Sequence, residues 1–351
     1  MSKSTQSLGR NIGAILAGCA IAIVTAMPSS AWAQAQENKS SGGPRLDFPA
    51  GLATDGAGLF VSNSRNNTID KIDLTSHTLT LLAGQLFKDG SNDGIGAAAM
   101  FHSPSGLAII GTNLYVSDTN NSVIRKITLP GATVSTVAGA VNIPGSDDGK
   151  GDAAHFNLPT QIAADPNGSR LFVTDSNNSL IRMIQVPDMV VKTIAGQAQV
   201  EGKDNGPGAK SSFNRPRGIA TDGKFIYISD TGNNLIRKID LSNMTTSTLA
   251  GTGEEGDKDG GPTEAQFNNP GAMATDGTNV YVLDADNHAV RKIELATGTV
   301  SKVTLVNGHI GSGCVLSKDN KILYFSDTTE NAVQQVDVSN GNVVPTFPLQ
   351  Q

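Results

Sequence analysis

A motif that recurs six times constrains the fold of this chain more than any other feature. One copy runs Leu-Tyr-Val-Ser-Asp from Leu114 to Asp118 and continues through Asn121 to Ile124-Arg125-Lys126. The residue that closes the first part of each copy is Asp, or Asn in the first copy. It falls at positions 63, 118, 175, 230, 284 and 327, so the steps are 55, 57, 55, 54 and 43 residues. Such a period predicts one supersecondary unit that is copied in space.

Each unit is predicted to form four short strands. The first is an apolar segment that follows a proline, as in residues 218–220 after Pro216. An Asp-Gly or Asn-Gly turn leads to the second strand, which carries an aromatic residue and ends at the Asp. The third strand is the Ile-Arg-Lys stretch, and the fourth is rich in Thr and Val, as in residues 133–137. No segment keeps a helical period, so the class is all-β.

Closure into a ring follows from the size of the unit. A sheet of four short strands cannot cover both of its faces, whereas sheets stacked around an axis cover one another. The sequence therefore predicts a six-bladed β-propeller of four-stranded antiparallel blades. The predicted propeller domain is 48–351, with blades at about 48–84, 101–139, 156–196, 213–251, 267–308 and 309–347.

The repeated unit resembles the NHL repeat. The resemblance rests on the Pro-x-Gly-Leu/Ile-Ala strand, the strand that ends in Ser/Thr-Asp, the Asn three residues later and the Ile-Arg-Lys stretch. It covers about residues 48–347 and implies a propeller of the NHL type. The units are longer than usual for NHL repeats, because extra residues lie between the fourth strand and the next Phe.

The first 33 residues indicate an export signal. Lys3 and Arg10 precede an apolar run from Ile12 to Met27, and residues 31–33 offer the small residues that a signal peptidase recognises. Two alternatives remain: lipidation at Cys19 after a lipobox-like segment, or an uncleaved anchor. Each places the protein outside the cytoplasm, and the main interpretation predicts a periplasmic or secreted protein with no membrane span in the mature chain. Residues 34–47 are predicted to be a flexible polar segment.

Charge and cysteine content limit the partners. The chain has 26 Lys and Arg against 32 Asp and Glu, and removal of the leader's two basic residues leaves 24 − 32 = −8. An acidic balance disfavours nucleic acid and anionic membranes. Cys19 lies in the leader, so Cys314 has no partner for an internal disulfide and is interpreted as a core residue. We expect a monomer.

The repeated polar and aromatic residues are interpreted first as structural. The aromatic three residues before the Asp or Asn is predicted to be core: Phe60, Tyr115, Phe172, Tyr227, Tyr281 and Tyr324. The repeated Asn, at 66, 121, 178, 233, 287 and 331, is predicted to stabilise a turn, with ligand binding as the alternative. Four arginines are each predicted to pair with the Asp seven residues earlier or with turn carbonyls: Arg125, Arg182, Arg237 and Arg291.

The long connections between units are the candidate binding surface. They span residues 85–100, 140–155, 197–212 and 252–266 and carry net charges of −1, −2, 0 and −4. Topology predicts that they share one face with the Asp-Asn turns, over the mouth of the central channel. The candidate ligand-binding residues on this face are Asp93, Asp148, Asp257, Asp259, Asn121, Asn178, Asn233 and Asn287. Weak Ca²⁺ binding by such acidic loops is the alternative to a protein without a cofactor.

The predicted function is an exported, non-enzymatic binding or scaffold module for a protein, a peptide or a polysaccharide. The alternative is an enzyme, a lyase or lactone hydrolase with a divalent cation in the central channel, because some NHL-type propellers use channel histidines in this way. The five histidines, His77, His102, His155, His288 and His309, form no close pair at zinc-binding spacing. No residue is assigned a catalytic role and no metal ligand is assigned.

Overall fold

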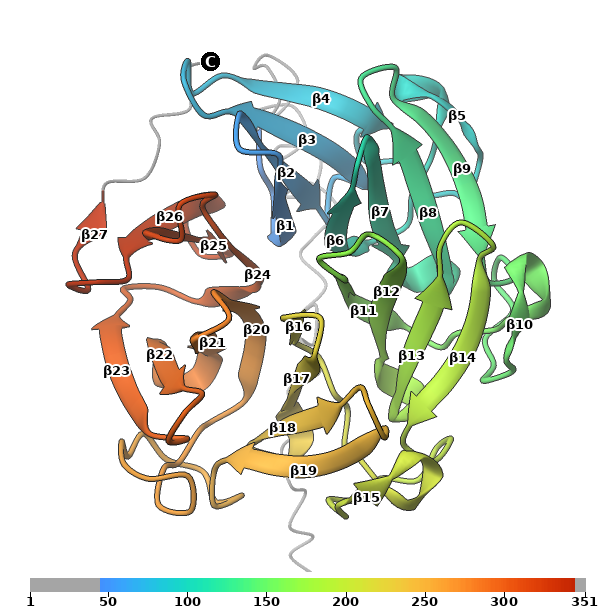
Figure 1. The fold of residues 1–351 in the computed structure, drawn as a ribbon. Helices are drawn as coiled ribbons and strands as arrows, with labels where there is room; N and C mark the ends of the chain where they lie inside the picture. Colours follow the sequence, from blue (N-terminus) through green and yellow to red (C-terminus); the bar gives the residue numbers. More distant parts are fainter. Residues whose placement is uncertain (1–44, 345–351) are drawn as a thin grey trace, which may run out of the picture. The chain divides into compact units, whose positions relative to one another are not determined.

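The computed structural model describes residues 45–344, which form six antiparallel sheets around an axis (Figure 1). The export signal, Cys19 and Gln34 lie outside the described residues. The strands of the first three blades are β1 (Pro49–Thr54), β2 (Gly58–Asn63), β3 (Thr68–Asp73) and β4 (Leu79–Gly84); β6 (Pro104–Ile110), β7 (Asn113–Asp118), β8 (Val123–Thr128) and β9 (Thr133–Ala138); β11 (Pro159–Ala164), β12 (Arg170–Asp175), β13 (Leu180–Gln185) and β14 (Val190–Ala195).

The last three blades repeat the same order. Their strands are β16 (Ile219–Thr221), β17 (Phe225–Asp230), β18 (Leu235–Asp240) and β19 (Thr245–Ala250); β20 (Pro270–Thr275), β21 (Asn279–Asp284), β22 (Ala289–Glu294) and β23 (Val300–Leu305); β24 (Ile310–Leu316), β25 (Ile322–Asp327), β26 (Ala332–Asp337) and β27 (Val343–Val344). Short 3-10 turns join the second and third strands in four blades: η2 (Thr119–Asn121), η4 (Ser176–Asn178), η6 (Thr231–Asn233) and η7 (Ala285–Asn287).

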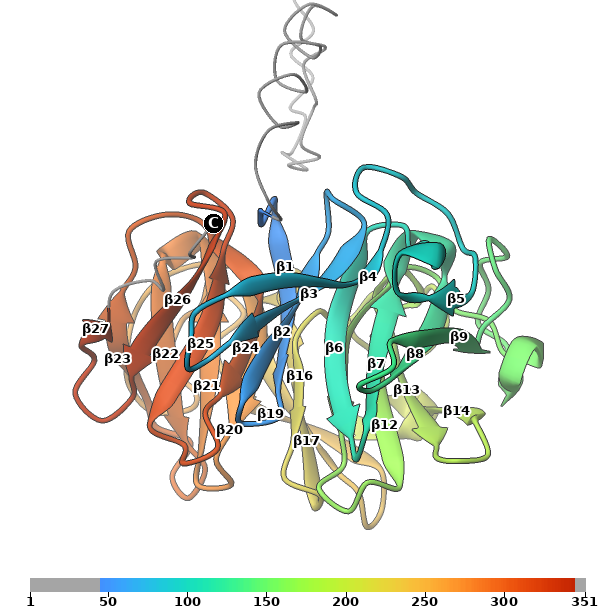
Figure 2. The same cartoon turned by 90° about the horizontal axis from the view of Figure 1, so that it is seen from above.

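The six blades close into a ring. The innermost strands pack in the order β1, β6, β11, β16, β20 and β24, and β24 packs against β1 again (Figure 1). Viewed at right angles, the blades stand side by side around the axis (Figure 2). The predicted all-β, six-bladed propeller is confirmed.

The core lies between neighbouring blades rather than within them. One cluster joins Ala53 and Phe60 of the first blade to Leu107 and Leu114 of the second, and it includes Phe101, which follows their connection. The repeated aromatics predicted as core are buried, with Phe60 and Tyr115 each 1% exposed. A blade without its neighbours would expose these side chains, so stacking supplies the burial that stabilises each sheet.

Three of the long connections form structure that the sequence did not predict. Each adds a two-residue strand to the outer edge of the next blade: β5 (Gly94–Ile95) pairs with β9, β10 (Gly149–Lys150) with β14 and β15 (Gly206–Pro207) with β19. Figure 1 shows all three at the periphery of the ring. These blades therefore have five strands instead of the predicted four.

Candidate functional site

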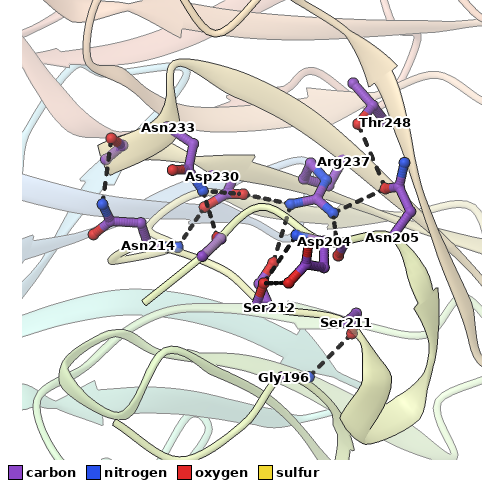
Figure 3. A network of polar contacts seen from close by, with 12 residues as sticks. Gly196, Asp204, Asn205, Ser211, Ser212, Asn214, Asp230, Asn233, Arg237 and Thr248 are labelled. Carbon is purple, nitrogen blue, oxygen red and sulfur yellow. Dashed lines mark hydrogen bonds and ion pairs between the residues drawn. The ribbon is translucent and has the colours of Figure 1, made fainter. Parts of the chain in front are cut away.

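A buried arginine organises the polar network of each of four blades. In the fourth blade, Arg237 Nη1 lies 2.6 Å from Asp230 Oδ2 and donates to Ser212 O at 3.1 Å (Figure 3). Its Nη2 donates to Asp204 O at 2.8 Å and to Asn205 Oδ1 at 2.9 Å. The guanidinium also lies 5.1 Å from the ring centroid of Phe213. A guanidinium removed from water needs all of these partners.

The same network occurs in the second, third and fifth blades. The distances from Nη to the aspartate seven residues earlier are 2.8 Å for Arg125 and Arg182 and 2.7 Å for Arg291. The predicted pairing of these arginines is thus confirmed. Burial is the largest influence on Asp230 and raises the pKa of this carboxyl, and Arg237 and two further hydrogen bonds, from Asn214 and Asn233, oppose that rise.

Seven of the eight candidate ligand residues belong to these networks. Asn121 Nδ2 donates to Asp118 Oδ2 at 2.8 Å and to Gly90 O at 2.7 Å, and the equivalent bonds recur at Asn178, Asn233 and Asn287. Asp93, Asp148 and Asp259 pair with the second guanidinium nitrogen of an arginine, while their side chains remain 51%, 48% and 44% exposed. Asp257 is more exposed, at 67%, and lies 3.1 Å from Lys302 Nζ.

The predicted position of the long connections over the channel mouth is wrong. Asp93 Oδ1 accepts a hydrogen bond from Thr136 of β9, and Asp148 Oδ1 accepts one from the backbone of Thr193 of β14. Both partners lie on the outermost strand of a blade. The connections run outward because an outer strand has unpaired backbone groups that a further strand can satisfy. The carboxylates of Asp93, Asp148 and Asp259 therefore lie beside the outermost strands of their blades. The exposed surface of the four long connections is called the acidic rim.

Asn331 also differs from its predicted role as the sixth turn Asn. It follows Glu330, and its φ of 50° places it in the left-handed region at the end of the turn. Its Oδ1 accepts a hydrogen bond from Phe48 N at 2.8 Å, so it joins the last blade to the first. The spacing in the sequence already contains this shift, because Asn331 lies four residues after Asp327, whereas the Asn of every other copy lies three residues after the Asp or Asn.

The central channel contains a cavity of about 500 Å³. Each blade contributes at least one large apolar side chain to its wall, which also exposes polar atoms; these side chains include Leu52, Leu107, Ile162, Ile219, Met273 and Val315. Cys314, predicted as core, also lines it and is half-buried against the core of the last two blades, and burial raises the pKa of its thiol. Asp55 and Lys318 are the charged residues of the lining.

Gln161 lines the same cavity and spans the channel. Its Nε2 donates a hydrogen bond to Ser312 O, which links the third blade to the sixth, on the opposite side of the ring. At the equivalent positions other blades have Gly51, Gly106 and Gly218, where a β-carbon would lie 2.0–2.6 Å from a carbonyl oxygen of the next blade.

The first and last blades lack the arginine. In the first blade, Asp70 is 1% exposed and accepts a hydrogen bond from Asn63 Nδ2 at 2.7 Å, so the acid and its partner have exchanged positions. Burial raises the pKa of Asp70 to about 6. In the last blade Gln334 takes the arginine's position and donates to Asp327 Oδ2 at 3.2 Å.

Two histidines that are 21 residues apart in sequence meet between the fifth and sixth blades. The ring centroids of His288 and His309 lie 5.5 Å apart, and His288 Nδ1 lies 2.7 Å from Gly308 O. Local spacing could not show this pair, because blade stacking brings it together. Within residues 45–344, no group of three His, Cys, Asp or Glu side chains converges as a metal centre.

Comparison with known proteins identifies relatives that carry the same repeat. NHL repeat-containing protein 2 from Bos taurus is 28% identical over 302 residues, which cover 60% of this chain and 42% of that protein. The relative from Gallus gallus is 26% identical over 360 residues, with 75% and 48% covered. These relatives carry the NHL repeat by name, and the chain has the six blades that the repeat builds. The chain is an NHL-repeat propeller.

This NHL-repeat propeller corresponds to only part of each of its relatives. The chain spans less than half the length of the curated relatives it matches, including the chloroplastic protein SUPPRESSOR OF QUENCHING 1 of Arabidopsis thaliana, 28% identical with 84% of this chain and 31% of that protein covered. No family model matches the chain.

Solved structures share the fold of the NHL-repeat propeller. A nidogen/laminin complex matches with a TM-score of 0.60 at 16% identity, covering 82% of this chain and 91% of that one. Virginiamycin B lyase from Staphylococcus aureus gives 0.54 at 14% identity, covering 87% and 86%. A gluconolactonase from Xanthomonas campestris gives 0.57 at 11% identity, covering 81% and 84%. Binding proteins and enzymes thus use this architecture, and the fold does not choose between them.

Proposed function

We propose that this NHL-repeat propeller is a non-enzymatic binding module that recognises a protein or another polymer through its acidic rim. The observation that supports the proposal is that the buried carboxylates of the repeat are already held in ion pairs. The buried acids Asp118, Asp175, Asp230 and Asp284 are each held by an arginine of the same blade. A catalytic acid or base must instead be presented to a substrate. The channel cavity has Asp55 and Lys318 as its charged lining residues, and no second carboxylate and no histidine of the lining joins them.

The long connections carry exposed acidic and apolar side chains, whereas the repeated acids of the interior are buried. Glu254 and Glu255 are exposed on the connection before the fifth blade, as is Asp257. Exposed apolar side chains stand on the preceding connections, with Phe87 47%, Ile143 56% and Val200 46% exposed. Exposed apolar groups beside acids suit a partner whose surface combines basic and apolar residues. We further propose that the module acts after export. No helix in the part of the chain that the structure describes has the length and apolar character to cross a membrane.

Charge reversal at the rim tests the proposal. The variant Glu254→Lys/Glu255→Lys changes two exposed acids on the connection. The matched control, Asp188→Lys/Glu294→Lys, changes two exposed acids at the opposite ends of the blades. Chemical crosslinking of the protein in the producing cells, followed by mass spectrometry, should give a partner whose yield falls about tenfold in the rim variant, as for loss of a steering charge pair. Equal yields in both variants would contradict a rim site.

Two further measurements separate the alternatives. Lactone hydrolysis by the purified protein that depends on Ca²⁺ or Mg²⁺ and disappears with a chelator would favour the enzyme. Cell fractionation and sequencing of the mature N-terminus test export, since cleavage after Ala33 should leave Gln34 first. A cytoplasmic, uncleaved protein would refute export without refuting the rim site.

A further inference from the structure

The two histidines between the fifth and sixth blades occupy positions that join blades elsewhere in the ring. At three junctions an Asn in the left-handed region ends the turn, and its Oδ1 accepts a backbone N–H from the next blade. The bonds are Asn67 to Ser103 N at 2.8 Å, Asn234 to Asn269 N at 2.9 Å and Asn331 to Phe48 N at 2.8 Å. These contacts need one acceptor oxygen and a short side chain, which is why Asn suits the position.

The junction between the fifth and sixth blades uses other chemistry. His288 occupies the Asn position, with a φ of 49°, and His309 occupies the position of the N–H donor. His309 N donates instead to Thr329 Oγ1 at 2.8 Å, within its own blade. The ring closes without needing imidazoles here, because Asn performs the same task at other junctions. The histidines therefore require an explanation beyond blade joining.

The contact of His288 fixes which ring nitrogen carries hydrogen. Nδ1 lies 2.7 Å from Gly308 O, and a carbonyl oxygen can only accept. Nδ1 of His288 must therefore donate, and neutral imidazole then keeps its lone pair on Nε2. A histidine that donates one N–H to a backbone carbonyl while its other nitrogen is free has the arrangement found in metal-binding histidines.

The second imidazole lies within reach of the first. The ring centroids of His288 and His309 are 5.5 Å apart, and the planes meet at 53°. Nitrogen ligands bind a metal ion at about 2.0–2.1 Å, so one ion can bridge rings that lie this close after a small side-chain rotation. His309 is exposed, which leaves it free to rotate and gives the ion access from solvent.

We propose that His288 and His309 chelate one divalent late transition-metal ion across the junction of the fifth and sixth blades. Imidazole suits Cu²⁺, Ni²⁺ and Zn²⁺, and Cu²⁺ should bind most tightly. Within residues 45–344 no third His, Cys, Asp or Glu completes the set, so water fills the other positions and the ion exchanges readily. The bound ion ties the fifth blade to the sixth, at one of the three junctions that lack the Asn bond; the other two have Ser122 and Ser179 at the Asn position.

The chain supplies its own test substitutions. His288→Asn introduces the residue of three other junctions, and His309→Ser introduces the residue found at Ser103. His102→Asn is the matched control, since Asn157 and Asn214 occupy the equivalent position in the next two blades and donate the same backbone N–H to an aspartate. All three variants should fold, because each copies another blade.

The experiment titrates Cu²⁺ and Ni²⁺ into the protein, purified without a histidine tag, by calorimetry and follows Cu²⁺ by electron paramagnetic resonance. The parent and His102→Asn should bind one ion through two imidazole nitrogens. His288→Asn and His309→Ser should each weaken binding about tenfold or more and show one imidazole. Unchanged binding in these variants, or no saturable site in the parent, would overturn the proposal. If His288→Asn did not fold, the exposed His309→Ser variant alone would decide.

Discussion

Replacement of Arg237 by Met tests the physical account of the blade network. The change leaves Asp230, 0% exposed, without its cation, and leaves the carbonyls of Ser212 and Asp204 without their donor. Loss of one partner of a buried ion pair costs about 3–5 kcal/mol. For a ring of this size about 1 kcal/mol corresponds to roughly 2 °C, so the melting temperature should fall by roughly 6–10 °C.

The loss should depend on pH in a defined direction. Burial already raises the pKa of Asp230, and removal of Arg237 takes away one opposing influence. A carboxyl whose folded-state pKa lies above its unfolded value binds protons more tightly when folded, so stability rises as pH falls. The gap between variant and parent, measured by urea denaturation, should therefore be smaller at pH 5 than at pH 7.

The neighbouring Lys238 provides the control. It lies on the same strand with its side chain on the other face, 4.9 Å from the Phe225 ring, and Lys238→Met should cost about 1 kcal/mol or less. The network would be refuted as a source of stability if Arg237→Met melted within 2 °C of the parent or matched Lys238→Met.

Three further predictions follow from departures in single blades. The folded-state pKa of Asp70, about 6, lies above the unfolded value, so its contribution to stability decreases from about pH 4 to pH 6; Asp70→Asn should match the parent near pH 4 and exceed it by up to about 3 kcal/mol at pH 7 in urea denaturation. Asn205→Asp would give Arg237 the second carboxylate that the other three arginines have, and should add about 0.2–1 kcal/mol because the site is exposed; a loss of stability would contradict this. Gly218→Ala would place a β-carbon 2.0 Å from Gly271 O and should destabilise by about 3 kcal/mol, whereas Gly131→Ala meets nothing within 4 Å and should change the midpoint little.

The features that could be predicted from the sequence are the strands of one blade and the contacts between side chains on paired strands. The spacing between Asp118 and Arg125 places the two side chains as diagonal neighbours on paired strands, since Asp118 faces Val123 across the hairpin. The pattern of apolar and aromatic residues predicted the strands for the same reason. The edge strands β5, β10 and β15 were missed because two residues carry no side-chain period, and backbone hydrogen bonding to the next blade creates them.

Contacts that depend on ring closure could not be predicted from one unit. Gln161 and Ser312 are 151 residues apart, and their hydrogen bond exists because the third and sixth blades face each other. His288 and His309 meet because neighbouring blades stack. In both cases the sequence contains the residues but gives no sign of their proximity, since each lies in a different copy of the repeat.

The repeat itself indicates where function should be sought. A residue that recurs in four or more blades, such as the arginine or the turn Asn, performs in each blade a task that the fold requires. Gln161, Asp70 and the pair of His288 and His309 occur where other blades have Gly, Arg or Asn at equivalent positions. The fold is built without these residues in the remaining blades, so stability of the ring does not explain them. Binding chemistry that belongs to this chain alone is therefore to be tested first at such departures and at the exposed rim.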